Sequence, residues 1–405
     1  MWEQIRSNQI RSVVLVAGMG VLLLLLGYLL GEVFTGNGIA GVIVAVIVWV
    51  IMSLVAYAQG DSILLAVSKA RKINPADHPR LYNIVEEMKI ASGLEKMPDV
   101  YIIDDPALNA FATGRDPNHA SVAITSGLLQ KLNRDELQGV IGHEISHIKN
   151  RDVLTMAMCA VLLGTIVILA WYASRMLFFG GMTRSRRSSS KDSGGGQIII
   201  LVVAIVLMIL APIMAQLIYF AVSRKREYLA DASSALYTRY PEGLASALEQ
   251  IAGSSTELSS ANKATAPMYI SNPFRKEGMS VSDLTATHPP ISERVRILRA
   301  MGGASFAEYD KAYRQMHRGK GVVPPSALTA PAAGPLRSAQ PGAVEEEDKV
   351  ERTRETSSLM WRLNAYKTID CDCGTTLRIP PNFSESTVAC PHCGRVHEVA
   401  EAQTR

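Results

Sequence analysis

The sequence predicts a mainly α membrane protein, in which four hydrophobic helices carry an α+β domain and a small cysteine-rich module follows. Of the 405 residues, 48% are hydrophobic, and they are concentrated in separate runs. Four runs come near the ~20 residues that a helix needs to cross a bilayer. They are Val13–Leu30, Gly38–Ala58, Val153–Phe179 and Gln197–Val222. Four of the five cysteines lie close together near the C-terminus.

The four runs are expected to form two membrane hairpins. The first run is interpreted as an anchor, because no convincing small-residue cleavage site follows it and a second run comes soon after. Residues 1–59 therefore form an N-terminal transmembrane hairpin, and residues 153–222 form a second hydrophobic hairpin. The lipid bilayer is a predicted partner, whereas a net charge of +4 is too mild to indicate nucleic acid.

Two more polar segments, residues 60–152 and 223–321, are predicted to form the α+β domain. The first begins with a helix-like stretch over residues 78–92. Three strand-like runs follow it: Val100–Ile103, Ala110–Thr113 and Ser121–Thr125. Asn133, with Glu136 three residues later, is typical of the start of a helix. This helix leads almost directly into the third apolar run, so we expect it to lie at the membrane surface.

Within that helix, residues 143–147 read His-Glu-Ile-Ser-His. Histidines four residues apart lie on one helix face, about one turn from each other, so both imidazoles reach one metal ion. Glu144 is offset by roughly 100° per residue, which directs its carboxylate to a water on the metal instead of to the metal itself. Zinc lowers the pKa of that water, and Glu144 takes the proton. The pattern predicts His143 and His147 as zinc ligands and Glu144 as the catalytic base.

A catalytic zinc site usually has three protein ligands and one open position. Glu227 is the best candidate for the third ligand, because the second apolar hairpin returns the chain to the same membrane face. Asp231 lies one helical turn further on and is a candidate outer partner that orients a ligating histidine. The alternative interpretation places both carboxylates on a solvated acidic face after a basic cluster.

Five segments carry a resemblance to a known family. They are Asn109–Gly114, Ala123–Leu128, Asp135–His147, Arg226–Asp231 and Thr287–Arg294. With them, roughly residues 1–300 resemble the HtpX-like integral membrane zinc metallopeptidases, which are relatives of the CAAX prenyl proteases. The resemblance implies a zincin-like α+β metallopeptidase domain, with one catalytic Zn²⁺ on His143, His147 and Glu227, and Glu144 as base. It also implies hydrolysis of misfolded or damaged membrane proteins on the cytoplasmic side, as protein quality control.

The resemblance suggests further roles around the site. His288, which precedes two prolines, is a candidate to stabilise the tetrahedral oxyanion near the zinc. Arg294 is a candidate either to orient His288 or to pair with Asp231. An edge strand to which an extended substrate adds by main-chain hydrogen bonds is expected at Asn109, Ala110, Phe111 and Ala112; ordinary core packing is the alternative for Phe111. Three other histidines are predicted to lie at the surface: His78, His119 and His317.

The last part of the chain differs in composition. Residues 322–358 are rich in Pro, Ala, Ser and charge, and are predicted to be a disordered linker. Residues 359–405 resemble a zinc ribbon. The predicted ligands of a second, structural Zn²⁺ in a closed tetrahedral site are Cys371, Cys373, Cys390 and Cys393. The first pair has one intervening residue instead of the commoner two. Because ribbons often bind partners, an adaptor protein is a candidate partner, and no catalytic role is expected.

The basic residues predict an orientation in the membrane. Arg6, Arg11, the block that starts at Lys69, and residues 224–226 lie on one side if all four runs cross the bilayer. The positive-inside rule makes that side cytoplasmic, so the active site and C-terminus are predicted to face the cytoplasm from the inner membrane. The basic loop 181–196 disagrees with this rule. Either the other basic segments outweigh this loop in setting the orientation, or the last two runs form a shallow hairpin that does not fully cross the bilayer.

Two alternatives to a membrane endopeptidase stay open. A CAAX-type prenyl-protein protease is expected to carry more membrane spans around a chamber, and the presence of four runs argues against it. A non-catalytic membrane scaffold that recruits partners through the ribbon has no chemical need for Glu144, which is present.

Overall fold

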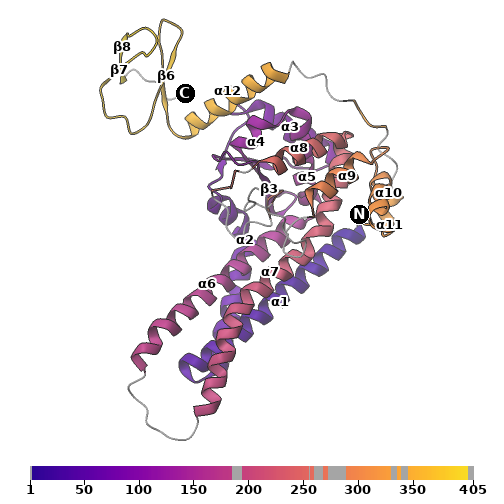
Figure 1. Cartoon of the computed structure of the whole chain (residues 1–405), viewed down its shortest axis with the longest axis vertical. Helices are drawn as coiled ribbons and strands as arrows, with labels where there is room; N and C mark the ends of the chain where they lie inside the picture. Colours follow the sequence, from indigo (N-terminus) through magenta and orange to yellow (C-terminus); the bar gives the residue numbers. More distant parts are fainter. Residues whose placement is uncertain are drawn as a thin grey trace.

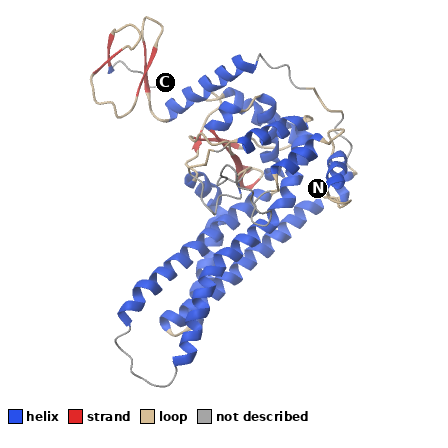
Figure 2. Ribbon diagram, in the orientation of Figure 1, coloured by secondary structure: helices blue, strands red, loops and turns tan. Residues whose placement is uncertain are grey.

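The computed structural model describes residues 2–184, 194–254, 256–259, 268–271, 289–329, 335–338 and 345–399. Long helices project together from one side of a globular domain, and short β-hairpins lie beyond helix α12 (Figure 1). Helices dominate the described chain, and strands occur in the globular domain and in the C-terminal hairpins (Figure 2). The prediction of a mainly helical protein is confirmed.

The long helices are α1 (Trp2–Thr35), α2 (Gly38–Val67), α6 (Asp152–Arg184) and α7 (Gly194–Thr238). Among the described residues, three helical segments are long and apolar enough to cross a membrane: Val16–Thr35, Gly38–Val67 and Asp152–Arg175. The fourth predicted run lies in α7 but is not one of these three, so the count of four is not confirmed. Helices α1 and α2 approach closely, since a Cβ on Gly41 would lie 2.1 Å from the carbonyl oxygen of Gly27. Small residues commonly permit such contacts in membranes.

Two of these helices extend beyond the predicted boundaries. Helix α2 continues past Ala58 to Val67, and its last turns bury Leu64 and Leu65 in an apolar cluster with Phe111. Helix α7 continues without a break from the apolar run to Thr238. The reason is tertiary packing, because the polar turns that follow each apolar run are enclosed by the globular domain. The membrane helices therefore enter this domain directly, without connecting loops.

The globular domain contains a four-stranded sheet with the order β1-β2-β4-β3. Its strands are β1 (Arg71–Lys72), β2 (Asp99–Ile103), β3 (Ala110–Asp116) and β4 (His119–Thr125). Strands β2 and β4 are parallel, whereas β3 pairs with β4 antiparallel. The three strands expected from the sequence are thus present, and β3 lies at an edge of the sheet as predicted. Helix α3 (Pro79–Ser92) also matches its predicted range.

Helix α5 (Arg134–Lys149) carries the His-Glu-Ile-Ser-His motif. A capping box begins it: Asn133 Oδ1 accepts the Glu136 N–H at 2.9 Å, and Glu136 Oε2 accepts the Asn133 N–H at 2.8 Å. Every residue of α5 from Glu136 to Ile148 is buried, because α3, α7 and α8 (Pro241–Gly253) pack around it. Gly139 lets α8 approach, since a Cβ there would lie 2.6 Å from the Leu244 nitrogen. The motif helix therefore lies at the centre of the domain.

The segment predicted as a disordered linker, residues 322–358, is ordered in its described parts, and the prediction is corrected for residues 322–329 and 345–358. Val322 and Val323 are buried, and their N–H groups donate to Asp310 Oδ1 at 2.7 and 2.9 Å. Two helices follow, α11 (Pro325–Leu328) and α12 (Glu345–Leu363). Amino-acid composition fails to predict order here because the segment packs against the folded globular domain. It therefore needs few apolar residues of its own to become ordered.

Helix α12 packs on α4 (Ser126–Lys131), and its Leu359 and Met360 join the main hydrophobic core. Its Glu355 lies 3.4 Å from His78, whose Nδ1 accepts the Leu81 N–H and so caps α3. His78 is 1% exposed, which corrects the prediction that it lies at the surface. Burial lowers the pKa of His78 to about 4, so this imidazole is neutral in the folded protein near pH 7.

The C-terminal module consists of two hairpins. Strands β5 (Lys367–Asp370) and β6 (Thr376–Ile379) form the first, and β7 (Thr387–Ala389) and β8 (Val396–Glu398) form the second. The guanidinium of Arg378 on β6 lies 3.1 Å from the ring centre of Trp361 on α12. This stacked contact joins the module to a helix that is itself packed on the globular domain.

Candidate metal centre

Three side chains that are far apart in the sequence meet in the centre of the domain. His143 and His147 lie on α5, and Glu227 lies on α7; all three are at most 6% exposed. The two histidine Nε2 atoms are 3.3 Å apart, and the Glu227 carboxylate lies 3.5 Å from one and 3.6 Å from the other. One ligand atom from each residue lies within 4.8 Å of the others. The sequence-predicted ligand set is therefore brought together.

These distances and donor types fit a zinc ion. Two ligand atoms about 2.1 Å from a tetrahedral zinc lie roughly 3.4 Å from each other, close to the observed separations. Two imidazoles and one carboxylate form a common ligand set for a catalytic zinc site. Burial opposes a charge on His143, but its hydrogen bonds with Asp231 and Glu227 outweigh this and raise its pKa to about 9. The surrounding carboxylates thus stabilise positive charge at this point.

Each of the two histidines in this candidate site also contacts a second carboxylate. His143 Nδ1 lies 3.0 Å from Asp231 Oδ1, and His147 Nδ1 lies 3.2 Å from Asp152 Oδ2. Because an ionised carboxylate only accepts hydrogen bonds, Nδ1 of each ring carries a proton, and Nε2 is the atom that faces the candidate metal position. Asp231 matches its predicted position, whereas Asp152 was not predicted. The available signal was a carboxylate in the first turn of an otherwise apolar helix.

Arg294 on α9 (Ile291–Arg299) is completely buried behind this site. Its Nε and Nη2 donate to the two oxygens of Asp231 at 2.8 and 2.7 Å, which is a bidentate pair. Burial alone would raise the pKa of Asp231, but the Arg294 charge outweighs it and lowers the pKa. Arg294 Nη1 also lies 3.7 Å from Glu227. Of the two predicted alternatives for Arg294, pairing with Asp231 is confirmed.

Glu144 lies near His143, His147 and Glu227 and is 2% exposed. Burial raises its pKa, and the neighbouring charges of His143 and His147 oppose that shift. The Ala112 backbone lies close to this carboxylate and acts to lower its pKa. Strand β3 and the candidate base are therefore in direct contact, which places the β3 backbone next to the metal centre.

The chain itself covers the beginning of the β3 edge. The Ile270 N–H donates to Ala110 O at 3.0 Å, and Asn109 Nδ2 donates to Ser271 O at 3.1 Å. Phe111 is 1% exposed and packs edge-on against Tyr269, with ring centres 5.2 Å apart. Phe111 is therefore a core residue, which agrees with the alternative interpretation of this position. Of the predicted substrate-binding residues, Asn109 and Ala110 already have partners within the chain.

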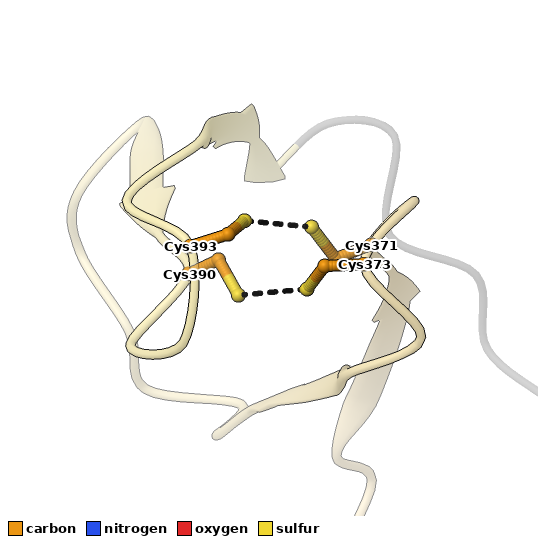
Figure 3. A group of neighbouring side chains, drawn as sticks. All are labelled: Cys371, Cys373, Cys390 and Cys393. Atoms are coloured by element: carbon orange, nitrogen blue, oxygen red, sulfur yellow. Dashed lines mark hydrogen bonds between the residues drawn. The ribbon is translucent and has the colours of Figure 1, made fainter.

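His288 lies outside the described residues. The C-terminal cysteines, in contrast, converge as predicted (Figure 3). Cys371 Sγ lies 3.5 Å from Cys393 Sγ, and Cys373 Sγ lies 3.7 Å from Cys390 Sγ. Sulfur atoms around a tetrahedral zinc at about 2.3 Å are separated by roughly 3.8 Å, so this set also fits a metal ion.

A glycine with positive φ follows each cysteine pair. Gly374 has φ 86° and Gly394 has φ 74°, a conformation that favours glycine. The Gly374 N–H donates to Cys371 O at 2.8 Å, and the Gly394 N–H donates to Cys390 O at 2.9 Å. Both turns thus close on a glycine of positive φ, although the second turn is one residue longer, and the turns explain the Cys-Gly steps in the sequence.

Comparisons with known proteins agree with this site. Residues 75–302 match the model of peptidase family M48. A protein named "Protease HtpX homolog" from Lactobacillus helveticus is 42% identical over 301 residues, which is 74% of this chain and all of that protein. A protein of the same name from Dictyoglomus turgidum is 44% identical over 301 residues, 74% of this chain and 95% of that one.

A structural likeness to the crystal structure of S. mikatae Ste24p has a TM-score of 0.36 and 19% identity, over 73% of this chain and 66% of that chain, and is too weak to support an inference. The family match covers more than half of the chain and includes the histidine motif and Glu227. With its apolar helices, the protein is a membrane zinc metalloendopeptidase. The chain belongs to peptidase family M48.

Proposed function

We propose that His143, His147 and Glu227 hold one catalytic zinc ion and that Glu144 is the general base of peptide-bond hydrolysis. The observation that carries this proposal is the convergence of three buried ligand atoms within 4.8 Å of one another, beside a buried carboxylate. When bound, zinc supplies Lewis-acid chemistry: it lowers the pKa of a water at its open position and polarises a carbonyl group.

The environment of Glu144 suits proton transfer. Burial raises its pKa from the ordinary carboxyl range, which brings it closer to the pH at which the enzyme works. Glu144 then accepts a proton from the attacking water and passes it to the leaving amine. Asp231 and Asp152 hold the two imidazoles in the tautomer that a metal needs, and Arg294 holds Asp231. His288 is proposed as the residue that stabilises the oxyanion, on the family resemblance alone.

The β3 edge supports binding of an extended polypeptide substrate. Because Ala110 O is already paired with Ile270 within the chain, we place the added substrate strand along β3 from Ala112 onward. Binding through main-chain hydrogen bonds depends little on which side chains the substrate carries. Such binding therefore suits unfolded substrates of varied sequence. Two relatives of this chain are named as proteases, which agrees with a polypeptide substrate. We therefore propose misfolded or damaged membrane proteins as substrates, in a role of protein quality control.

We further propose that all four long helices cross the inner membrane and that the globular domain faces the cytoplasm. Helices α1, α2, α6 and α7 project from the same side of the domain (Figure 1). Basic residues lie where three of these helices meet the domain, as the positive-inside rule requires of the cytoplasmic side: Lys69 after α2, Arg151 before α6 and Arg226 in α7. We also propose that the four cysteines hold a second, structural zinc ion in a zinc ribbon, to which an adaptor protein binds.

The test is zinc content together with cleavage of casein and of an unfolded membrane protein, measured for the purified protein and for Glu144→Gln. We expect the variant to keep its catalytic zinc, because Glu144 is no ligand, and to lose at least ~10²–10⁴ in rate. Near-normal turnover would refute the base assignment. Absence of cleavage by the unmodified, zinc-loaded protein would favour a scaffold instead.

A further inference from the structure

Asp152 contacts the candidate metal centre in the described part of the chain, and none of the sequence motifs contains it. It is the first residue of membrane helix α6, two residues after the C-cap Asn150 of α5. Its side chain is 1% exposed, and Oδ2 lies 3.2 Å from His147 Nδ1. A carboxylate at the start of an apolar helix is costly to bury unless it has hydrogen-bonded partners. The fold nevertheless directs it inward.

The second oxygen of Asp152 faces a different helix. Asp152 Oδ1 lies 3.7 Å from Nη1 of Arg226, which is 3% exposed. Arg226 directly precedes the ligand Glu227 on α7. The carboxylate of Asp152, on α6, therefore contacts His147 on α5 and Arg226 on α7. Both contacts lie at or next to a proposed zinc ligand. The start of α6 is thus connected to both ligand-bearing helices.

The chemistry of the His147 contact is specific. The carboxylate accepts from Nδ1–H, so the proton stays on Nδ1 and the ring presents Nε2 to the ligand cluster. Such outer partners fix ring orientation and increase ligand basicity, and their loss typically costs roughly 10–100-fold in metal affinity or activity. Asp231 does the same for His143 and is itself held by Arg294. The two histidines therefore have parallel supports from different parts of the chain.

We propose that Asp152 is a positioning residue for the metal ligand His147 and that, through Arg226, it ties the beginning of α6 to the α7 segment that carries Glu227. The second membrane hairpin is then a structural part of the metal centre as well as an anchor. This inference rests on the proposed role of His147 as a zinc ligand, and its test separates the two claims.

The test uses the full chain in detergent or lipid nanodiscs, with Asp152→Ala, Asp152→Asn and Asp152→Glu. The zinc dissociation constant is measured by competition with a chelator, and the absorption bands of the Co²⁺-loaded protein report the ligand geometry. We expect Asp152→Ala to weaken zinc binding by roughly 10–100-fold and to shift the Co²⁺ bands. Asparagine keeps an oxygen acceptor but not the charge, so we expect Asp152→Asn to lose less zinc affinity than Asp152→Ala. Asp152→Glu keeps the charge and should bind zinc more tightly than Asp152→Ala.

Asp116→Asn is the matched control, because Asp116 also lies beside a histidine, 2.9 Å from His119 Nδ1, but on an exposed hairpin. It is expected to leave zinc affinity and the Co²⁺ spectrum unchanged. Wild-type affinity and spectrum in Asp152→Asn and Asp152→Ala would overturn the proposal. His147→Ala separates the two claims: if it keeps the zinc, the ligand assignment itself is wrong. If Asp152→Ala does not fold, the zinc affinity and Co²⁺ spectrum of the near-isosteric Asp152→Asn decide whether the proposal holds.

Discussion

His143 and His147 occupy equivalent places on α5, yet their outer nitrogens face different parts of the chain. Asp231 on α7 accepts from one, and Asp152 at the start of α6 accepts from the other. The spacing of the histidines made the metal site predictable, because a helix fixes which side chains share a face. The carboxylate partners are set by how three helices meet, and only Asp231 lay close enough to a recognised pattern to be predicted.

Glu227 and Asp231 are expected to differ in their effect on metal binding. Glu227→Ala removes the proposed third ligand, so we expect loss of both zinc and peptidase activity. Asp231→Asn removes only the charge behind His143, so the loss is expected to be roughly 10–100-fold in affinity or activity. Zinc content after dialysis against a weak chelator distinguishes them. Full zinc occupancy in Glu227→Ala would mean that another carboxylate is the third ligand.

His78 predicts a stability change at acid pH. Burial lowers its pKa from 6.5 to about 4, so the folded protein binds fewer protons at this site than the unfolded chain does. The stabilising contribution of neutral His78 is therefore complete above pH 6.5 and declines as the pH falls from 6.5 toward 4.

The measurement is the thermal unfolding midpoint from pH 7.5 to 4.5, for the unmodified protein and for His78→Asn. Asparagine still caps α3 but does not titrate in this range. We expect the variant to lose less stability on acidification. Identical pH profiles would show that protonation of His78 does not contribute.

At the scale of the elements, helix α12 packs on the globular domain and connects the C-terminal hairpins to it. Polar composition predicted a disordered linker, but Leu359 is completely buried and Met360 is 8% exposed in the core of the globular domain. Arg362 Nη2 also donates to Asp77 O at 2.8 Å. A few apolar side chains are enough when they pack on a domain that is already folded. The C-terminal hairpins are consequently attached to a docked helix.

Two truncations are expected to differ in stability. A chain that ends at Gln340 loses α12 and exposes the core beneath Leu359 and Met360, at a cost of about 2 kcal/mol for each buried side chain. A chain that ends at Tyr366 keeps α12 and loses only the hairpins. We expect a lower unfolding midpoint for the shorter chain and almost no change for the longer one. Equal midpoints would mean that α12 does not support the domain.

At the scale of the whole molecule, two candidate metal sites lie in separate parts of one chain. The His143, His147 and Glu227 site is central and buried, and the four-cysteine site lies beyond α12. Four thiolates leave no open position for a water, so the second site is closed to the chemistry of the first. This separation predicts a simple stoichiometry.

The full chain is expected to bind two zinc ions and the chain that ends at Tyr366 only one, measured by elemental analysis of the purified proteins. Both should cleave a short soluble peptide at similar rates, because the catalytic ligands are unchanged. If the shorter chain keeps its zinc and its fold but no longer cleaves the peptide, the hairpins belong to the catalytic machinery.

The sequence by itself determined the local features of this protein: the apolar runs, the strands of the sheet, the capped motif helix and the cysteine pairs. Each depends on residues near one another in the chain, where periodicity, capping and ligand spacing act directly. Only the tertiary structure decided which distant groups meet. It brought Asp152 to His147 and residues 268–271 onto the β3 edge, and it decided between the two predicted partners of Arg294 in favour of Asp231. Such contacts result from helix packing, which no short segment of the chain encodes.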